Sequence, residues 1–152
     1  MKNKILLFLA LICCSYATFA QNKLFDKFSD MDGVTSVFIS KTMLQMMPNM
    51  KTNGLDIGNV AGKLESIEIL TSEKKSIAQM MRAETAYIAK DKSYEELMKI
   101  KDDGSKVSFF IRKSGGDKIK ELVMLVDETS EFVIIRILGD MTLKDIQNIT
   151  KQ

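Results

Sequence analysis

The fold is decided by the stretch KVSFFIRKSGGDKIKELVMLVDETSEFVIIRILGD, residues 106–140. It contains three β-rich runs, 106–113, 118–127 and 131–139, separated by short breaks rich in glycine, aspartate and serine. Breaks of this composition and length connect neighbouring antiparallel strands as hairpins. Because a fourth β-rich run at 94–101 comes directly before them, the sequence predicts a C-terminal four-strand antiparallel meander.

The region upstream adds two strands and several helical segments. Strand character at 34–40 and 64–70 brings the predicted sheet to six strands. Apolar spacing predicts a short helix over 23–31 and a longer one that is capped by Ser72 and continues to about Lys90. Between them the sequence predicts a Met-rich helical turn from Thr42 to about Met47 and a loop at 49–62 with one helical turn near 57–61.

A final helix is predicted from Thr142 through Ile149, because Asp145 stands three residues after the threonine, as in a capping box. The resulting fold class is α+β, a two-layer sandwich in which a mostly antiparallel sheet of about six strands carries the long and terminal helices on one face. The chain has no fixed-period repeat and no linker that would divide it. We therefore expect residues 21–152 to form a single domain.

Residues 1–20 have the layout of a secretory signal peptide. A basic start precedes ten unbroken apolar residues from Ile5 to Cys14, far fewer than the about 20 that a membrane-spanning helix needs. Small and polar residues follow, and cleavage fits best after Ala20, which leaves Gln21 as the new N-terminus. We expect an exported protein, in the periplasm or associated with the outer membrane.

A lipoprotein anchored in a membrane through Cys14 is the alternative. Lipoprotein processing requires a small residue before the modified cysteine, whereas Cys14 follows Ile12 and Cys13. Cleavage after Ala20 would instead remove both cysteines and two lysines, leaving 132 of the 152 residues and a formal charge of 0 in place of +2. A balanced chain has no electrostatic footprint for nucleic acid.

Residues 21–152 contain neither histidine nor cysteine. The usual general base at neutral pH, thiolate catalysis and ordinary zinc ligation are therefore absent. No glycine-rich phosphate loop precedes a helix either. The composition predicts a non-enzymatic protein without a cofactor or a metal.

One motif would favour an enzyme. Ser72 and Lys75 form an S-x-x-K pattern, and Lys113-Ser114-Gly115 resembles the K-[ST]-G element of penicillin-recognising enzymes. A small hydrolase with Ser72 as nucleophile and Lys75 as its base is the resulting alternative. The S-D-N element is missing, and we prefer to interpret the two patterns as a helix cap and a hairpin turn.

A methionine cluster suggests a second alternative. Its members, at i, i+3, i+4 and i+7, are Met43, Met46, Met47 and Met50. On one helix they would present four thioethers on a single face, and thioethers select Cu(I). Pro48 disfavours helical geometry at Met47, and methionines commonly fill cores, so packing is the preferred interpretation and periplasmic Cu(I) binding the alternative.

Glu84 falls at the centre of the apolar stripe of the long helix. A carboxylate in that position must be paired or must lie near the edge of the core. We therefore expect a lateral salt bridge, or an apolar stripe that shifts along the helix, in preference to a functional site.

The best candidate interaction surface is one face of the meander. The run 132–138 is apolar on both sides, and such strands are usually covered on both sides. Arginine and aromatic residues are enriched in interface cores. If neighbouring strands contribute alternate residues to the same face, the candidate surface comprises Phe110, Arg112, Phe132, Ile134 and Arg136. We expect a protein partner or self-association there; the open alternative is that a loop or the N-terminal helix covers this face.

Three segments of the chain resemble a known family: FSDMDGVTSVFISKTMLQMM (28–47), KLESIEIL (63–70) and IKELVMLVDETSEFVIIRILGDMTLKDIQNI (119–149). They are similar to the small exported proteins of Bacteroidota grouped as domain of unknown function 4252. The resemblance covers nearly all of the chain after the leader, and it rests on strands and turns without a catalytic signature. It implies an envelope protein, in a family where many relatives look like lipoproteins, and it supplies no catalytic residues.

Overall fold

A computed structural model of the chain describes residues 23–46, 51–52 and 55–150. The predicted signal peptide, its cleavage site at Ala20 and Gln21, and Cys14 lie outside the described residues, as do Met47 and Met50. Within the described part of the chain, no helix combines the length and the apolar character needed to cross a membrane.

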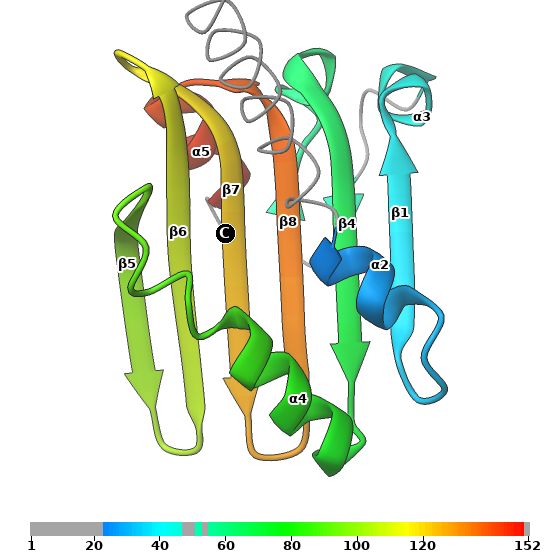
Figure 1. The fold of residues 1–152 in the computed structure, drawn as a ribbon. Helices are drawn as coiled ribbons and strands as arrows, with labels where there is room; N and C mark the ends of the chain where they lie inside the picture. Colours follow the sequence, from blue (N-terminus) through cyan, green and yellow to red (C-terminus); the bar gives the residue numbers. More distant parts are fainter. Residues whose placement is uncertain (1–22, 47–50, 53–54, 151–152) are drawn as a thin grey trace, which may run out of the picture.

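A six-stranded antiparallel sheet forms the centre of the molecule, in the order β1-β4-β8-β7-β6-β5 (Figure 1). Its strands are β1 (Thr35–Ser40), β4 (Leu64–Ser72), β5 (Tyr94–Asp102), β6 (Ser105–Gly115), β7 (Lys118–Glu128) and β8 (Phe132–Met141). The strand number and the β5–β8 meander confirm the predicted α+β fold class. Although β8 comes last in the chain, it lies inside the sheet between β4 and β7.

The remaining elements surround this sheet. They are α2 (Lys23–Ser29), α3 (Lys41–Met46), α4 (Lys75–Thr85), α5 (Leu143–Thr150), the 3₁₀ helix η2 (Ala61–Lys63) and the small hairpin of β2 (Lys51–Thr52) and β3 (Leu55–Asp56). The predicted capping box begins α5: the backbone N–H of Thr142 donates to Oδ2 of Asp145 at 2.8 Å, and the N–H of Asp145 donates to Oγ1 of Thr142 at 3.3 Å.

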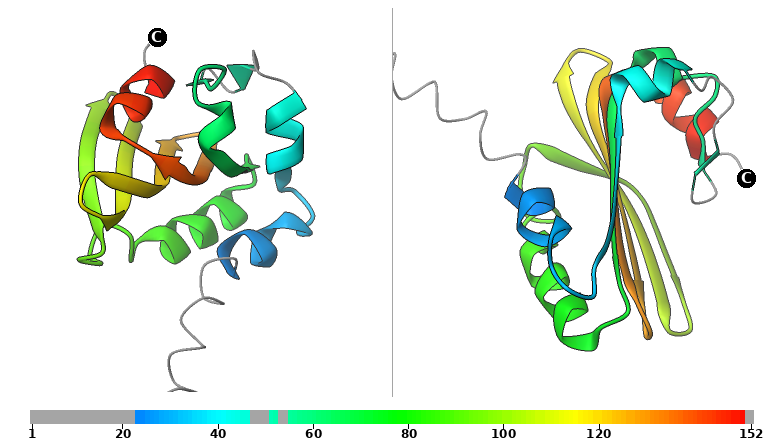
Figure 2. Two further views of the ribbon diagram at one scale, coloured as in Figure 1. Left: turned by 90° about the horizontal axis from the view of Figure 1, so that it is seen from above. Right: turned by 90° about the vertical axis from the view of Figure 1, so that its right-hand side faces the viewer.

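The helices cover both faces of the sheet, whereas the sequence predicted that the long and terminal helices share one face. Figure 2 shows α2 and α4 on one side and α3 and α5 on the other. The physical reason is that the central strands are apolar on both sides: α4 packs on Leu70 and Ile134, while α5 packs on Leu122 and Ile137. We call these two sides the α4 face and the α5 face.

The long helix is shorter than its apolar pattern predicted, since α4 ends at Thr85 and turns follow up to Lys90. The Thr85 hydroxyl donates back to the carbonyl of Met81 at 2.9 Å. The turns carry Ile88 to the sheet, where it is 2 % exposed and packs on Phe110 and Val123. The apolar spacing that continued past the helix therefore reflects a buried turn.

The α5 face is buried at one end and open at the other. Near α3 and α5, a row across four strands is fully buried, namely Ile111, Leu122, Ile137 and Ile67. Four residues further along the strands, the corresponding row across β5 to β8 is only half-buried or exposed; its members are Ile100, Val107, Val126 and Val133. The helices on this side thus cover only part of the sheet.

Candidate functional site

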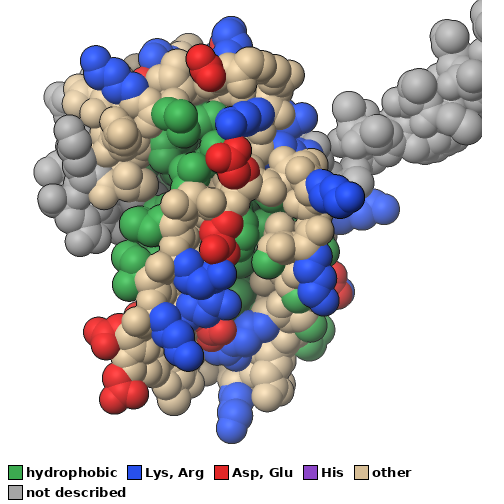
Figure 3. Space-filling model, turned by 90° about the vertical axis from the view of Figure 1, so that its left-hand side faces the viewer, with side chains coloured by type: hydrophobic (Ala, Val, Ile, Leu, Met, Phe, Trp, Pro, Cys, Tyr) green, Lys and Arg blue, Asp and Glu red, His purple; other side chains and the backbone are tan. Residues whose placement is uncertain are grey.

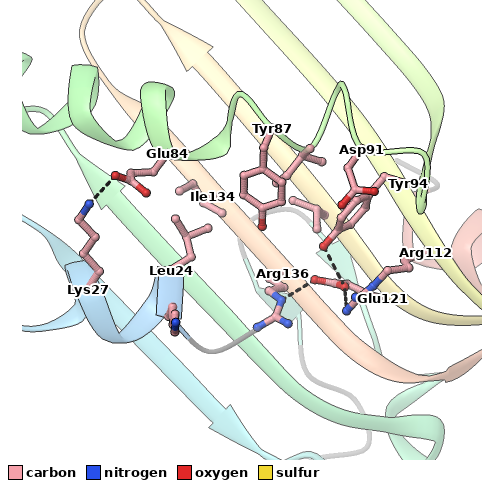
Figure 4. Close-up of a pocket in the computed structure, with 13 residues that line it drawn as sticks. Leu24, Lys27, Glu84, Tyr87, Asp91, Tyr94, Arg112, Glu121, Ile134 and Arg136 are labelled. Atoms are coloured by element: carbon pink, nitrogen blue, oxygen red, sulfur yellow. Dashed lines mark hydrogen bonds and ion pairs between the residues drawn. The ribbon is translucent and has the colours of Figure 1, made fainter. Parts of the chain in front are cut away.

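A pocket of about 510 Å³ opens between α2, the end of α4 and the α4 face of the sheet (Figure 4). Three charged side chains from neighbouring strands line its floor, namely Arg112, Glu121 and Arg136. Apolar walls come from Leu24, Ile88, Val123 and Ile134. Tyr87 and Tyr94, with Lys23, Lys27, Glu84 and Asp91, complete the lining. The pocket therefore combines apolar walls with a charged floor, as is usual for a ligand site.

Arg136 is the centre of the floor. Its Nε donates to Oε1 of Glu121 at 2.5 Å, and its Nη1 donates to Oε2 of Glu68 at 2.9 Å. All three side chains are buried, at 6 %, 1 % and 6 % exposure respectively. Burial acts to lower the pKa of Arg136, but the charges of Glu121 and then Glu68 outweigh it and raise this pKa. The guanidinium thus stays charged between two carboxylates.

Glu121 also faces Arg112 and Tyr94. The Tyr94 hydroxyl donates to Oε2 of Glu121 at 3.2 Å, and Nη2 of Arg112 lies 2.5 Å from the same oxygen. Nε and Nη2 of Arg112 are buried and have no hydrogen bond of good geometry to the described residues, so the close contact with Glu121 is an ion pair. Burial, and then the charge of Glu121, raise the pKa of Tyr94, which keeps its hydroxyl protonated as a donor.

Strand pairing brings this network together. Arg136 on β8 is opposite Glu68 on β4, and Arg112 on β6 is opposite Glu121 on β7. Glu121 is opposite Leu138, two residues from Arg136 and on the same face. Three adjacent antiparallel pairs thus place two arginines and two glutamates side by side beneath the helices.

The mouth of the pocket is formed by α2 and the end of α4. Lys27 of α2 forms an ion pair with Glu84 of α4, and both side chains are partly exposed, at 41 % and 45 %. The prediction of a lateral salt bridge for Glu84 is therefore confirmed. Nearby, the rings of Tyr87 and Tyr94 meet edge to face, with centroids 6.4 Å apart and an interplanar angle of 71°.

The predicted interaction surface is assembled but covered. Its five residues share the α4 face. Phe110 on β6 lies in one row, across Val123 on β7, with Arg136 on β8, and the other three lie at even spacing along the same two strands, namely Arg112 on β6 and Phe132 and Ile134 on β8. Phe110, Phe132 and Ile134 are only 3 %, 3 % and 2 % exposed, and α2 and α4 pack over this face. The expectation of an exposed docking face there was wrong, and the alternative of a covering N-terminal helix was closer. Arg112, Ile134 and Arg136 instead line the pocket.

The Ser72 hydroxyl of the hydrolase alternative is hydrogen-bonded to backbone groups, and the four-methionine alternative lies partly outside the described residues. The Ser72 hydroxyl donates to the carbonyl of Gly33 at 2.7 Å and accepts from the N–H of Lys74 at 3.2 Å. By register Ser72 lies in the row of Lys106, where β6 begins, and therefore at the opposite end of the sheet from Lys113, which pairs with Glu95 at 2.8 Å. No group of three or more Asp or Glu side chains that could hold a metal occurs among the described residues.

The methionines of α3 do not pack in the core as expected. Leu44 is the buried residue of this helix, while Met43 and Met46 are 44 % and 67 % exposed. The preferred packing interpretation was therefore wrong for these two methionines. The other two members of the cluster, Met47 and Met50, lie outside the described residues.

Sequence reasoning missed Glu68, Glu121 and Tyr94. A signal existed for Glu121, because the Gly115-Gly116 turn predicts a hairpin that places this carboxylate close to Arg112 on the neighbouring strand. Glu68 had no such signal, since its partner lies on a strand that is distant in the sequence.

An α+β domain with a six-stranded antiparallel sheet and a pocket over paired buried charges is the class that this geometry defines. The chain belongs to the family described as Domain of unknown function (DUF4252), whose sequence profile matches residues 28–149. The resemblance to this family is thereby confirmed. A search of curated proteins finds no match to the chain.

Proposed function

We propose that the protein is a non-enzymatic binding module that holds a small neutral or zwitterionic molecule in the pocket over Arg136 and Glu121. The observation that carries the proposal is the balance of charge in a cavity of about 510 Å³. Four cationic side chains line it, and with Glu68 beneath the floor four anionic side chains oppose them. A ligand of large net charge would find no unmatched counter-charge, whereas a zwitterion or a polar neutral molecule can bind to both signs.

The size and walls of the pocket support a small ligand. Its volume falls within the about 300–1,000 Å³ typical of ligand sites. Leu24, Ile88 and Val123 would contact an apolar portion, and Tyr87 offers an aromatic ring at the mouth, where it is 49 % exposed. Buried charges held in fixed positions lose little freedom on binding, which favours affinity for a small molecule.

A binding role is favoured over catalysis because the floor lacks a free base. Both oxygens of Glu121 are engaged, one by Arg136 and the other by Tyr94 and Arg112. A general base must be able to reach a proton on the substrate. The described residues of the pocket offer no serine, threonine or cysteine as a nucleophile.

Binding is tested by NMR chemical-shift perturbation, with free amino acids and neutral monosaccharides as probes at millimolar concentration. Binding should shift the amide signals of residues 84–94 and 121–123. Tyr87→Ala should weaken it about tenfold by removing the ring at the mouth. Phe38→Ala is the matched control, since Phe38 is 59 % exposed and does not line the pocket. Shifts confined to other regions, or equal losses in both variants, would contradict the proposal.

The same proposal places the protein outside the cytoplasm, in the periplasm or at the outer membrane, like the Bacteroidota proteins that the sequence resembles. The signal-like leader supports this location. Intact mass of the protein from cells should correspond to residues 21–152. A mass that includes Met1 would contradict export, and a lipid-bearing chain that begins at Cys14 would replace the soluble form with an anchored one.

A further inference from the structure

The open end of the α5 face is an apolar surface that the pocket does not explain. Six side chains on β5 to β8 form it: Met98, Ile100, Val107, Met124, Val126 and Val133, here called the open patch. Ile100 and Met98 are 50 % and 41 % exposed, and the other four are half-buried. Figure 3, which faces the β5 edge, shows hydrophobic side chains exposed along the left-hand flank of the molecule.

Charged side chains are absent from the open patch and from the two rows of the sheet that contain it. The register continues from Val133 to Thr71 and Thr35, and from Met124 through Ile135 and Ile69 to Val37. None of these positions carries a charge. Soluble monomers rarely expose contiguous apolar surface of this kind, and such surfaces mark interaction sites.

We propose that the open patch is a dimer interface at which a second copy of this chain packs sheet against sheet. Two stacked sheets lie about 10 Å apart, and a helix with its side chains is about 10–12 Å thick. The layer formed by α3 and α5 is therefore about as thick as a second sheet. A second copy, related by a two-fold axis parallel to the sheets, fits its own sheet over the uncovered part of the α5 face, next to α3 and α5, without leaving a gap.

The absence of charge favours a second copy as the occupant. A two-fold axis brings each patch against itself, so any charge within it would meet a like charge at close range. The open patch avoids this penalty completely. Beside it, the turns at the strand ends carry Asp102, Asp103, Glu128 and Glu131, which would repel the anionic lipids of a membrane surface.

The area of the open end determines how strongly two copies are expected to associate. Strand spacing gives a footprint of about 250 Å² for two rows across the four strands β5 to β8, or about 500 Å² for two copies. Stable complexes bury about 1,200–2,000 Å², so the sheets alone form a weak interface. Contacts between the turns of one copy and the helical layer of the other add to this area. We therefore expect a dimer that dissociates on dilution, with a dissociation constant of roughly micromolar.

Sedimentation equilibrium of the purified chain tests the interface with a matched pair of variants. Met98 in the open patch and Met80 on the outer side of α4 are 41 % and 42 % exposed. Met98→Glu should weaken dimerisation at least tenfold, because each dimer would bury two carboxylates in an apolar interface. Met80→Glu, the same chemical change at equal exposure, should leave the dissociation constant unchanged.

A second variant distinguishes a weakened interface from a misfolded chain. Ile100→Thr keeps a β-branched side chain on an edge strand and removes apolar surface from the open patch, so it should also weaken the dimer while thermal unfolding stays cooperative. A chain that stays monomeric at every concentration overturns the proposal, as does a dimer that neither Met98→Glu nor Ile100→Thr weakens. A monomer whose patch resonances shift only when another protein is added would assign the surface to a different partner and overturn it equally.

Discussion

Alternate residues of the same strands form the two faces of the sheet, and the two faces bury different kinds of side chain. The α4 face buries Glu68, Glu121 and Arg136 within one connected network beneath two helices. The α5 face buries only apolar side chains on the sheet itself and leaves one end uncovered. Buried charges demand fixed partners, whereas apolar rows need only an apolar cover. One face therefore holds its charged side chains in fixed positions, and the other leaves apolar side chains exposed at one end.

The largest effect is expected from breaking the charge network on the α4 face. Glu121→Gln keeps the shape of the side chain but leaves Arg112 without its carboxylate and Arg136 with Glu68 alone. The free energy of unfolding, measured in urea, should fall by about 3–5 kcal/mol. The control is Glu95→Gln, which removes a 58 %-exposed partner of Lys113 and should cost less than about 1 kcal/mol. Equal losses in the two variants would show that the network does not hold the α4 face together.

The next largest effect on the free energy of unfolding is expected when the same substitution is made at the covered end and at the open end of the α5 face. Ile137→Ala, at 0 % exposure, should lower the free energy of unfolding by about 3 kcal/mol through lost burial and a cavity. Ile100→Ala, the same change at 50 % exposure, should cost less than about 1 kcal/mol when the protein is dilute enough to be monomeric. A cost at Ile100 as large as that at Ile137 would mean that the open end is covered within the monomer.

The smallest effect concerns a charged pair beside the α5 face. Lys63 donates to both oxygens of Asp145 at 2.8 and 2.9 Å. Burial acts to raise the pKa of Asp145, but the hydrogen bonds from Lys63 and Thr142 outweigh it and bring this pKa below its usual value of 3.8. Because the charged form is favoured in the folded state, its stabilisation is present above that usual value and is lost as pH falls through the lowered pKa.

Asp145→Asn should therefore cost about 1 kcal/mol at neutral pH, since it also weakens the capping box of α5. This difference from wild type should shrink as the pH is lowered from about 4 to about 2, as followed by urea unfolding. Asp140→Asn is the control, because the Lys118–Asp140 pair is 65 % and 63 % exposed. A difference that grows on acidification would have the wrong sign and would refute the assignment.

The meander was predictable because its information is local. Each turn from Asp102 to Glu131 carries the residues that its hairpin needs, and the strand ends follow within one or two residues. The Thr142–Asp145 capping box was predictable for the same reason, since its bonds span three residues. The side on which α5 then packs is decided by the whole sheet, and the sequence pattern did not contain it.

The candidate site was predictable only in part. The alternation along β8 correctly placed Phe132, Ile134 and Arg136 on one face and linked them with Arg112 on β6. Exposure could not be read from alternation, because an apolar row beneath a helix and an apolar row in an interface have the same pattern. The pairing of Glu68 with Arg136 depends on the position of β8 next to β4, which no local signal specifies.

The position of β8 also controls when the molecule can fold. Its neighbours are β7, which precedes it directly, and β4, which ends at Ser72, far from Phe132 where β8 begins. Long-range pairings of this kind form slowly, because the chain between them must be ordered first. As the polypeptide emerges from its N-terminus, β1 and β4 can pair with each other, but the other edge of β4 has no partner until β8 is made. The six-stranded sheet is therefore completed only when nearly the whole chain has been made.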